Sequence, residues 1–257
     1  MFSKIFKAFS GANKARMLAV TPQIKDKSTY KGKSLEDRIK EMKARSDYET
    51  LDRSQVSSAE RHVQRIASLS DKLPEISVPA GIKWLNTPDD KPLSFSKELG
   101  GKFVVVDFWS SCCINCIHVL AEMDRLEKRF EDIPEVAFLG CHSAKFKNEK
   151  DLHMLRQAVI RYDIKHAVLN DNEFEFWSTM GVNCWPTIMV FSPDAKPLIK
   201  MTGEGNEMFI QAILEQGLQT CVKQLGQSEL RETDWANLLS TEPVPMTLEK
   251  DKEMAKK

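Results

Sequence analysis

The residues best suited to chemistry are two cysteines, Cys113 and Cys116, that are separated by two residues. They follow the run from Val104 to Trp109, which begins with three valines, and they precede an amphipathic pattern. This order predicts a C-x-x-C pair at the start of a helix, where unpaired N–H groups and the helix dipole stabilise a thiolate. Because cysteines one turn apart can close a small disulfide ring, the pattern predicts a redox-active dithiol.

The segment after Cys116 predicts the helix that must carry this pair. Its apolar residues recur every three to four positions, while charged residues fill the other face. Such a helix packs on a sheet and presents its N-terminus to solvent. The apolar residues are Ile117, Leu120, Met123, Leu126 and Phe130.

Further strands and helices are predicted around it, and their order favours an α/β sandwich built on a mixed sheet. The turn sequence Ser192-Pro193-Asp194-Ala195-Lys196 predicts a hairpin between the last two strands. Trp177 is expected on a short helix. Strands are predicted at 82–85, 102–109, 136–141, 167–170, 187–191 and 198–201, and helices at 148–162 and 209–218.

The chain divides into four segments by composition. Residues 1–27 are basic and carry an apolar stripe, as a mitochondrial transit peptide does, and the alternative is a basic arm of a cytoplasmic protein. Residues 28–78 predict a helical extension with a break near 52–54, whose thin apolar stripes lie on the main domain or on a partner. Residues 79–226 form the predicted globular domain, and 227–257 a polar tail.

Composition narrows the functional classes. The 37 Lys and Arg balance the 37 Asp and Glu, so the bulk charge disfavours nucleic-acid binding. No stretch approaches the roughly 20 apolar residues that a transmembrane segment needs. Three of the six cysteines fall within five residues, which favours chemistry over a secreted disulfide framework.

Several separated motifs resemble one family. Val-Asp-Phe-Trp before the C-x-x-C, and Trp185-Pro186-Thr187 before a strand, resemble the thioredoxin fold, a central mixed sheet flanked by helices, over residues 79–226. The double cysteine at 112–113 makes the chain most similar to the thioredoxin-like domain of NHL-repeat-containing proteins, relatives of the TlpA and ResA type oxidoreductases. The other matching motifs are Trp84-Leu85-Asn86, His142-Ser143-Ala144-Lys145-Phe146 and Gly203-Glu204-Gly205.

The resemblance implies roles for individual residues. Cys113 matches the attacking cysteine and Cys116 the resolving one, while Asp107 matches the buried carboxylate that takes the proton from the resolving thiol. Pro186 matches the cis-proline that faces the dithiol and lets an extended substrate pair with the preceding backbone. The residues expected to flank this site are Trp109, Cys112, Asn115, Cys184, Trp185 and Thr187.

The chain also departs from thioredoxin. Ile114 and Asn115 replace Gly-Pro between the cysteines, and Cys112 replaces tryptophan before the nucleophile. Phe138 is expected in place of the lysine that accompanies the buried aspartate in thioredoxins. These differences disfavour a general-purpose thioredoxin.

Other roles for the cysteines were weighed. Zinc or an iron–sulfur centre is the competing chemical role, because its ligand types are present in Cys113, Cys116, His118 and His142. A tetrahedral site usually draws on two paired clusters, however, and the sequence has a single C-x-x-C. We therefore predict no metal and no organic cofactor. Cys112 is expected to pack against the domain and Cys184 to lie near the active disulfide, with a regulatory disulfide of Cys112 or of Cys184 as the alternative. Two further cysteines, Cys141 and Cys221, are expected to be buried.

Two functions remain open from the sequence. The first is a thiol-disulfide oxidoreductase that acts on protein disulfides, or that meets a reducing thioredoxin-type partner, through Cys113 and Cys116. The second is a thioredoxin-fold accessory subunit that docks through 28–78 and 227–257 in a large mitochondrial assembly such as a respiratory complex or ribosome.

Overall fold

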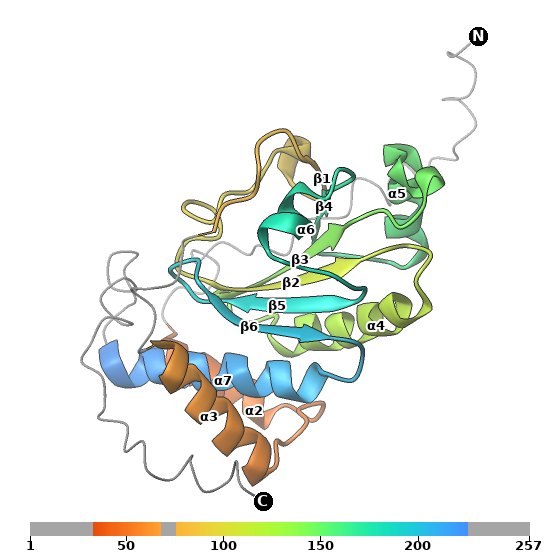
Figure 1. The fold of residues 1–257 in the computed structure, drawn as a ribbon. Helices are drawn as coiled ribbons and strands as arrows, with labels where there is room; N and C mark the ends of the chain where they lie inside the picture. Colours follow the sequence, from red (N-terminus) through yellow and green to blue (C-terminus); the bar gives the residue numbers. More distant parts are fainter. Residues whose placement is uncertain (1–32, 68–75, 226–257) are drawn as a thin grey trace, which may run out of the picture.

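The computed structural model describes residues 33–67 and 76–225 (Figure 1). The basic segment 1–27 and the tail 227–257 lie outside the described residues. Within the described residues, no helix is both long enough and apolar enough to span a membrane.

The core of the protein is a six-stranded mixed sheet in the order β1-β4-β3-β2-β5-β6. β2 and β3 pair in parallel, as do β3 and β4, whereas the pairings of β5 with β2, of β6 with β5 and of β1 with β4 are antiparallel. The mixed sheet and the hairpin of the last two strands are therefore confirmed. The strands are β1 (Lys83–Leu85), β2 (Phe103–Trp109), β3 (Val136–His142), β4 (Ala167–Asn170), β5 (Thr187–Phe191) and β6 (Pro197–Thr202).

Strand β2 lies in the middle of the sheet and leads directly into the C-x-x-C. All seven of its residues are buried, which explains why its sequence is apolar apart from Asp107. Asp107 lies opposite Gly140 on β3 and opposite Ile188 on β5. The one charged residue of the central strand is thus enclosed on both sides.

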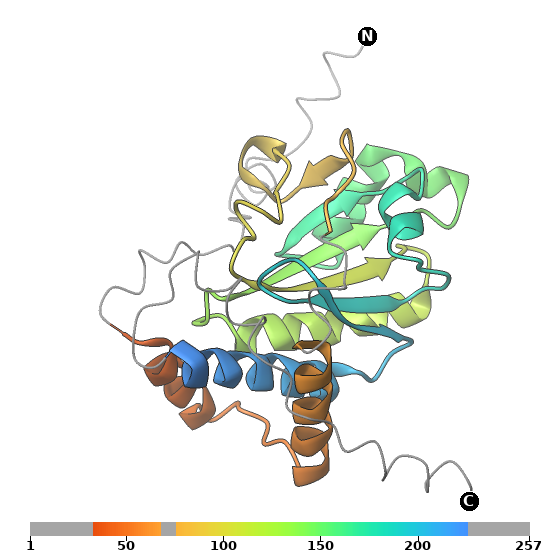
Figure 2. The ribbon, with the colours of Figure 1, turned by 60° about the vertical axis from the view of Figure 1, so that its left-hand side comes forward.

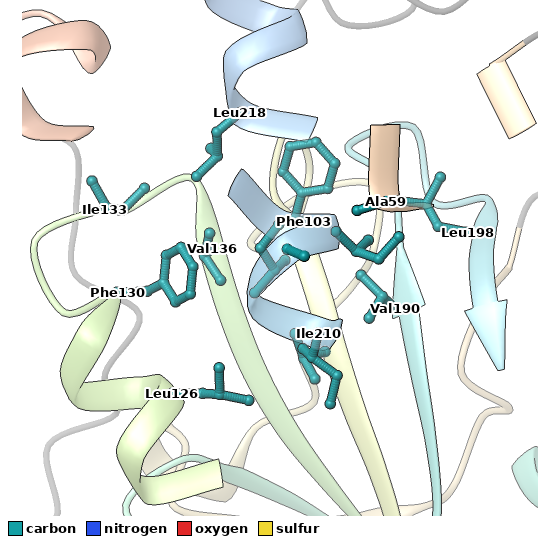
Figure 3. Close-up of a cluster of buried hydrophobic side chains, with 14 of the residues drawn as sticks. Ala59, Phe103, Leu126, Phe130, Ile133, Val136, Val190, Leu198, Ile210 and Leu218 are labelled. Atoms are coloured by element: carbon teal, nitrogen blue, oxygen red, sulfur yellow. The ribbon is translucent and has the colours of Figure 1, made fainter. Parts of the chain in front are cut away.

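Helices cover one face of the sheet. α4 (Ile114–Arg129), α7 (Glu207–Leu225), α2 (Leu35–Ala44) and α3 (Arg53–Ala67) bury side chains in one cluster with β2, β3, β5 and β6 (Figure 3). α5 (Leu152–Arg161) packs on β4 and α4 through a second cluster. The opposite face buries residues of the segment 76–99 and of α6 (Glu175–Thr179), whereas the short 3-10 turn η4 (Pro88–Asp90) within that segment is exposed. The short helix predicted around Trp177 is confirmed by α6.

The predicted helical extension packs on the main domain. α2 and α3 lie beside α7 in both ribbon views (Figures 1 and 2). Met42 of α2 is 2% exposed and Ala59 of α3 is fully buried. Two helices with a break between them are confirmed, but the break spans residues 45–52 and not 52–54. Asp52 accepts hydrogen bonds from the backbone N–H groups of Ser54 and Gln55 and caps α3, which already begins at Arg53. Within residues 33–67, the apolar stripes of α2 and α3 therefore pack on the main domain of the same chain.

The helix predicted at 148–162 is wrong at its start. Residues Lys147–Lys150 form a 3-10 turn, η5, and α5 begins only at Leu152. The side chain of Asp151 accepts a hydrogen bond of 2.7 Å from the N–H of His153, which fixes the helix start there. The turn that precedes α5 directs Glu149 toward the candidate site.

Candidate functional site

The two cysteines of the C-x-x-C differ in exposure. Cys113 is the N-cap residue of α4 and is half-buried, whereas Cys116 is fully buried in the first turn. Burial raises the pKa of Cys116, and contact with Cys113 and the negative charge of Asp107 raise it further. The arrangement is therefore an accessible thiol beside a buried thiol that holds its proton.

Asp107 lies beneath this pair on β2. It is fully buried, and none of the described residues forms a hydrogen bond with either of its carboxylate oxygens. Burial raises the pKa of Asp107 to about 7; the positive charge of His166 opposes this rise and the charge of Glu122 adds to it. A carboxyl group with such a pKa exchanges a proton near neutral pH, as a general base must.

Glu149 of η5 holds the loop that leads from β2 to Cys113. Its carboxylate accepts hydrogen bonds from Ser110 Oγ at 2.9 Å, from Ser111 Oγ at 2.7 Å and from the backbone N–H of Cys112 at 3.0 Å. The side chain of Glu149 is nearly fully buried. One buried carboxylate thus binds all three residues before the predicted nucleophile.

Glu149 remains ionised in this position. Burial works to raise its pKa, but the nearby His142, 3.7 Å away, and hydrogen bonds from Ser111 and Ser110 outweigh burial and hold the pKa well below its usual range. The backbone N–H of Phe146 donates a further hydrogen bond of 3.0 Å. A charged acceptor with this many donors is a strong local constraint.

The segment before β5 also contributes to the site. The Trp185–Pro186 peptide bond is cis, and Pro186 is buried. Trp185 is half-buried, donates a hydrogen bond of 3.0 Å from Nε1 to the carbonyl of Ser143, and packs on the same apolar cluster as Cys113. Thr187 Oγ1 donates to the carbonyl of Cys184 at 2.8 Å, which shapes the turn before Pro186.

The other predicted site residues take different positions. Trp109 is fully buried below the site, with its ring edge-on to His142 at 4.9 Å, and does not reach the surface. Asn115 is exposed on the first turn of α4. The prediction that Cys112 packs against the domain is wrong, because Cys112 is exposed while its backbone is held by Glu149. All six cysteines are free in this structure, so no Cys112–Cys184 disulfide is formed; Cys141 and Cys221 are buried.

The histidines named as ligand candidates are engaged elsewhere. His118 Nδ1 lies 2.6 Å from Glu204 Oε2, and His142 is buried between Trp109 and Glu149. In the described part of the chain, no group of three or more His, Cys, Asp or Glu side chains is arranged to hold a metal ion.

Sequence reasoning missed Glu149 and His166. Glu149 lies in the polar run Lys147-Asn148-Glu149-Lys150, whose composition is typical of a solvated surface. His166 is 59 residues from Asp107, and no local spacing marks it. No capping-box pattern marks Glu149 either, because Phe146 at the N-cap has no side-chain acceptor.

Comparisons with known proteins agree with this fold. Residues 100–196 match a family model described as thioredoxin-like. The chain is 40% identical to Protein SUPPRESSOR OF QUENCHING 1, chloroplastic, of Arabidopsis thaliana over 195 residues, 75% of this chain and 17% of that protein. It is 40% identical to NHL repeat-containing protein 2 of Homo sapiens over 147 residues, 57% of this chain and 20% of that protein.

Two more distant matches carry thiol-disulfide names. Thiol-disulfide oxidoreductase ResA of Bacillus cereus is 24% identical over 119 residues, 46% of this chain and 65% of that protein. The solved structure of a thiol-disulfide isomerase from Corynebacterium glutamicum has a TM-score of 0.51 and 18% identity, covering 58% of this chain and 97% of that one, and shows the same fold.

The chain spans a fifth or less of the length of the first two relatives. The residues matched by the family model include the C-x-x-C and the strands β2 to β5, and the resemblance to the NHL-repeat group is confirmed. Residues 100–196 therefore match the thioredoxin-like family model, and the chain has the thioredoxin-like fold.

Proposed function

We propose that this protein is a thiol-disulfide oxidoreductase that acts on protein disulfides through Cys113 and Cys116. The observation that carries the proposal is the half-buried Cys113 at the N-terminus of α4, in contact with the buried Cys116 above Asp107. An attacking thiol must be accessible, and a resolving thiol must stay protonated until the mixed disulfide has formed. A base must lie near the resolving thiol to take its proton.

The reaction proceeds in two exchanges. The thiolate of Cys113 attacks one sulfur of the substrate disulfide, so that a mixed disulfide forms and the other substrate sulfur leaves as a thiolate that takes up a proton. Cys116 then gives its proton to Asp107, and its thiolate attacks the sulfur of Cys113. The second substrate sulfur leaves as a thiolate. The substrate has then been reduced by two electrons and the protein oxidised by two, to a Cys113–Cys116 disulfide that an external dithiol must reduce.

Exposed apolar side chains near this end of the fold favour a protein substrate. Ile114, directly after Cys113, is 63% exposed, and Phe146, in the loop that Glu149 fixes, is 53% exposed. Lys145 lies over the rings of Phe146 and Trp185, at 5.8 and 6.0 Å from their centroids. Such groups suit an unfolded or extended peptide better than a small polar disulfide.

The relatives support this class of activity. The matched family is thioredoxin-like, and one relative is named a thiol-disulfide oxidoreductase. Because the first relatives are much longer than this chain, its substrate and its reducing partner remain proposals.

The test is the reduction of insulin disulfides by dithiothreitol with and without catalytic protein. We expect the protein to accelerate the reaction and Cys113→Ser to abolish the acceleration. Cys112→Ser, a matched change at an exposed neighbouring thiol, should retain it. Equal acceleration by Cys113→Ser and the unaltered protein would refute the assignment.

We also propose that the protein works in an organelle. The A. thaliana relative is named as chloroplastic, and the basic composition of residues 1–27 favours a mitochondrial address. A fusion of the full chain to a fluorescent protein tests this. Mitochondrial or plastid fluorescence supports an organellar address and decides between the two, whereas diffuse cytoplasmic fluorescence contradicts it.

A further inference from the structure

A second buried cluster lies beneath the dithiol, around Gly140 in the middle of β3. Gly140 lies opposite Asp107 in the parallel pairing of β2 and β3. A methyl group at Gly140 would lie 3.0 Å from Nε2 of His166 and 3.0 Å from Nε1 of Trp109. Because paired strands are about 4.8 Å apart, His166 and Trp109 border the same space as the Asp107 side chain.

The polar groups around this space have unused hydrogen-bonding capacity. Among the described residues, none bonds to either oxygen of Asp107, to Nε1 of Trp109 or to Nε2 of His166. Asp107 and Trp109 are fully buried and His166 is 3% exposed. Buried polar groups ordinarily have hydrogen-bond partners. We therefore treat Asp107, Trp109 and His166 as one set of interacting groups around Gly140.

His166 is held by a buried carboxylate on its other side. Its Nδ1 lies 2.5 Å from Oε1 of Glu127, which is 5% exposed. Burial works to lower the pKa of His166, but the charges of Glu127 and Asp107 outweigh burial and raise it. This rise favours the imidazolium form, in which Nδ1–H donates to Glu127 and Nε2–H faces the space over Gly140.

Asp107 has charged and titratable neighbours on several elements. His166 before β4 is positive, whereas Glu122 of α4 is negative and accepts a hydrogen bond of 2.7 Å from the N–H of Gly205. Cys116 of α4 lies close to the carboxyl group, whereas Cys141 of β3 belongs to the cluster on the opposite face of the sheet and interacts with Asp107 only through its charge. His166 itself faces Glu127 and Asp124 of α4 as well as Asp107.

We propose that His166, fixed by Glu127, is a positioning residue whose charge favours the ionised form of Asp107, so that Asp107 can accept the proton of Cys116 near neutral pH. The inference rests on the proposed function and deepens it. In the resolving step, the proton of Cys116 passes to Asp107 while the Cys116–Cys113 bond forms and the bond from Cys113 to the substrate sulfur breaks. The sequence expectation placed Phe138 where thioredoxins carry a lysine; in the structure Gly140 faces Asp107 and His166 supplies the positive charge.

Glycine at position 140 leaves room for this arrangement. A methyl group there would lie 3.0 Å from both rings, so His166 or Trp109 would have to shift by a few tenths of an ångström. His166 also borders a surface pocket that is lined in part by Glu127 and Phe138. The pair that holds the charge thus lies between the buried base and solvent.

The experiment is a single-turnover reaction of the fully reduced full-length protein with oxidised insulin, quenched with acid and followed from pH 5 to pH 10. Resolution of the mixed disulfide is measured by mass spectrometry. The rate of resolution is expected to rise with pH as Asp107 ionises, and this rise is the limb that is compared between variants. Without the charge of His166, Asp107 ionises only at higher pH, so His166→Gln should move the limb upward by about one pH unit, the effect of one nearby opposite charge. Glu127→Gln should shift it in the same direction, because the imidazole loses the carboxylate that keeps it charged.

Controls separate this inference from the proposed function. His62→Gln changes a histidine of α3 that bonds to the carbonyl of Leu198 and should leave the profile unchanged. Asp107→Asn should remove the limb. If neither His166→Gln nor Glu127→Gln moves the limb, the role of His166 is refuted while the dithiol mechanism stands; if Cys113→Ser still forms the mixed disulfide, the proposed function itself fails. Should His166→Gln not fold, Glu127→Gln alone decides.

Discussion

The carboxylate of Glu149 accepts a hydrogen bond of 3.0 Å from the backbone N–H of Cys112, the residue directly before the predicted nucleophile. The two residues are 37 positions apart in the chain, so the bond ties η5 to the loop between β2 and α4. Ser110 and Ser111 donate to the same carboxylate. The position of Cys113 therefore depends on a residue outside its own strand and helix.

Glu149→Gln should weaken this loop. The amide replaces one acceptor oxygen with a donor that faces other donors, and a buried hydrogen-bonding group left without a partner costs about 1–3 kcal/mol. We expect the free energy of unfolding to fall by that amount and insulin reduction to slow severalfold. Chemical denaturation and the turnover assay measure both. The control is Glu173→Gln, which changes an exposed carboxylate that pairs with Lys150; an equal loss in both variants would contradict the role of Glu149.

Asp107→Asn should stabilise the protein at neutral and higher pH. The folded protein keeps a proton on Asp107 up to a pKa of about 7, whereas the unfolded chain releases it near 3.8. The unaltered protein therefore loses stability relative to the variant as pH rises through this window, by roughly 4 kcal/mol at most. Urea denaturation at pH 4, 6 and 8 measures the difference. A constant difference over this range would show that Asp107 is not a raised, buried acid.

Met42→Ala should destabilise the whole domain. Met42 of α2 is 2% exposed in the same cluster as α7 and the sheet. Loss of such a side chain typically costs about 2–5 kcal/mol. Lys40→Ala on the exposed side of the same helix provides the control. A single cooperative transition that moves to lower denaturant is expected for Met42→Ala, and an unchanged midpoint would show that α2 is not part of the folding unit.

Gly217→Ala should also lower stability, although alanine favours helices. A methyl group on this residue of α7 would lie 2.6 and 2.7 Å from ring atoms of Phe103, the first residue of β2. Overpacking of a core of this kind costs about 1–3 kcal/mol, more than the gain of up to about 1 kcal/mol in helix propensity. Gln219→Ala on the same helix is the reference change. Thermal unfolding measures the stability of both variants. A Gly217→Ala protein that is as stable as Gln219→Ala would contradict the close contact between residue 217 and Phe103.

Local patterns account for most of the elements that the sequence predicted. The valine run of β2 and the turn residues between β5 and β6 specify their structures through backbone preference and burial, which act within a few residues. The C-x-x-C was placed at a helix start for the same reason. The start of α5 was missed because Asp151, and not the apolar spacing, fixes it.

The parts that were not predictable depend on contacts distant in sequence. The apolar stripes of α2 and α3 were visible, but their partner α7 lies more than 100 residues away. Glu149 and His166 are polar residues whose burial follows from the folded chain and not from their neighbours in sequence. A buried charge leaves no periodic pattern, so the electrostatic half of the site emerges only from the fold.

The most direct measurement of the central claim is a redox titration of the full-length protein in glutathione buffers, with alkylation and peptide mass spectrometry at each ratio. We expect Cys113 and Cys116 to lose their thiols together and reversibly, joined in one disulfide, while the buried Cys141 and Cys221 stay reduced. If Cys113 and Cys116 remain free thiols at every ratio, or if Cys113 pairs with another cysteine instead, the dithiol assignment is contradicted.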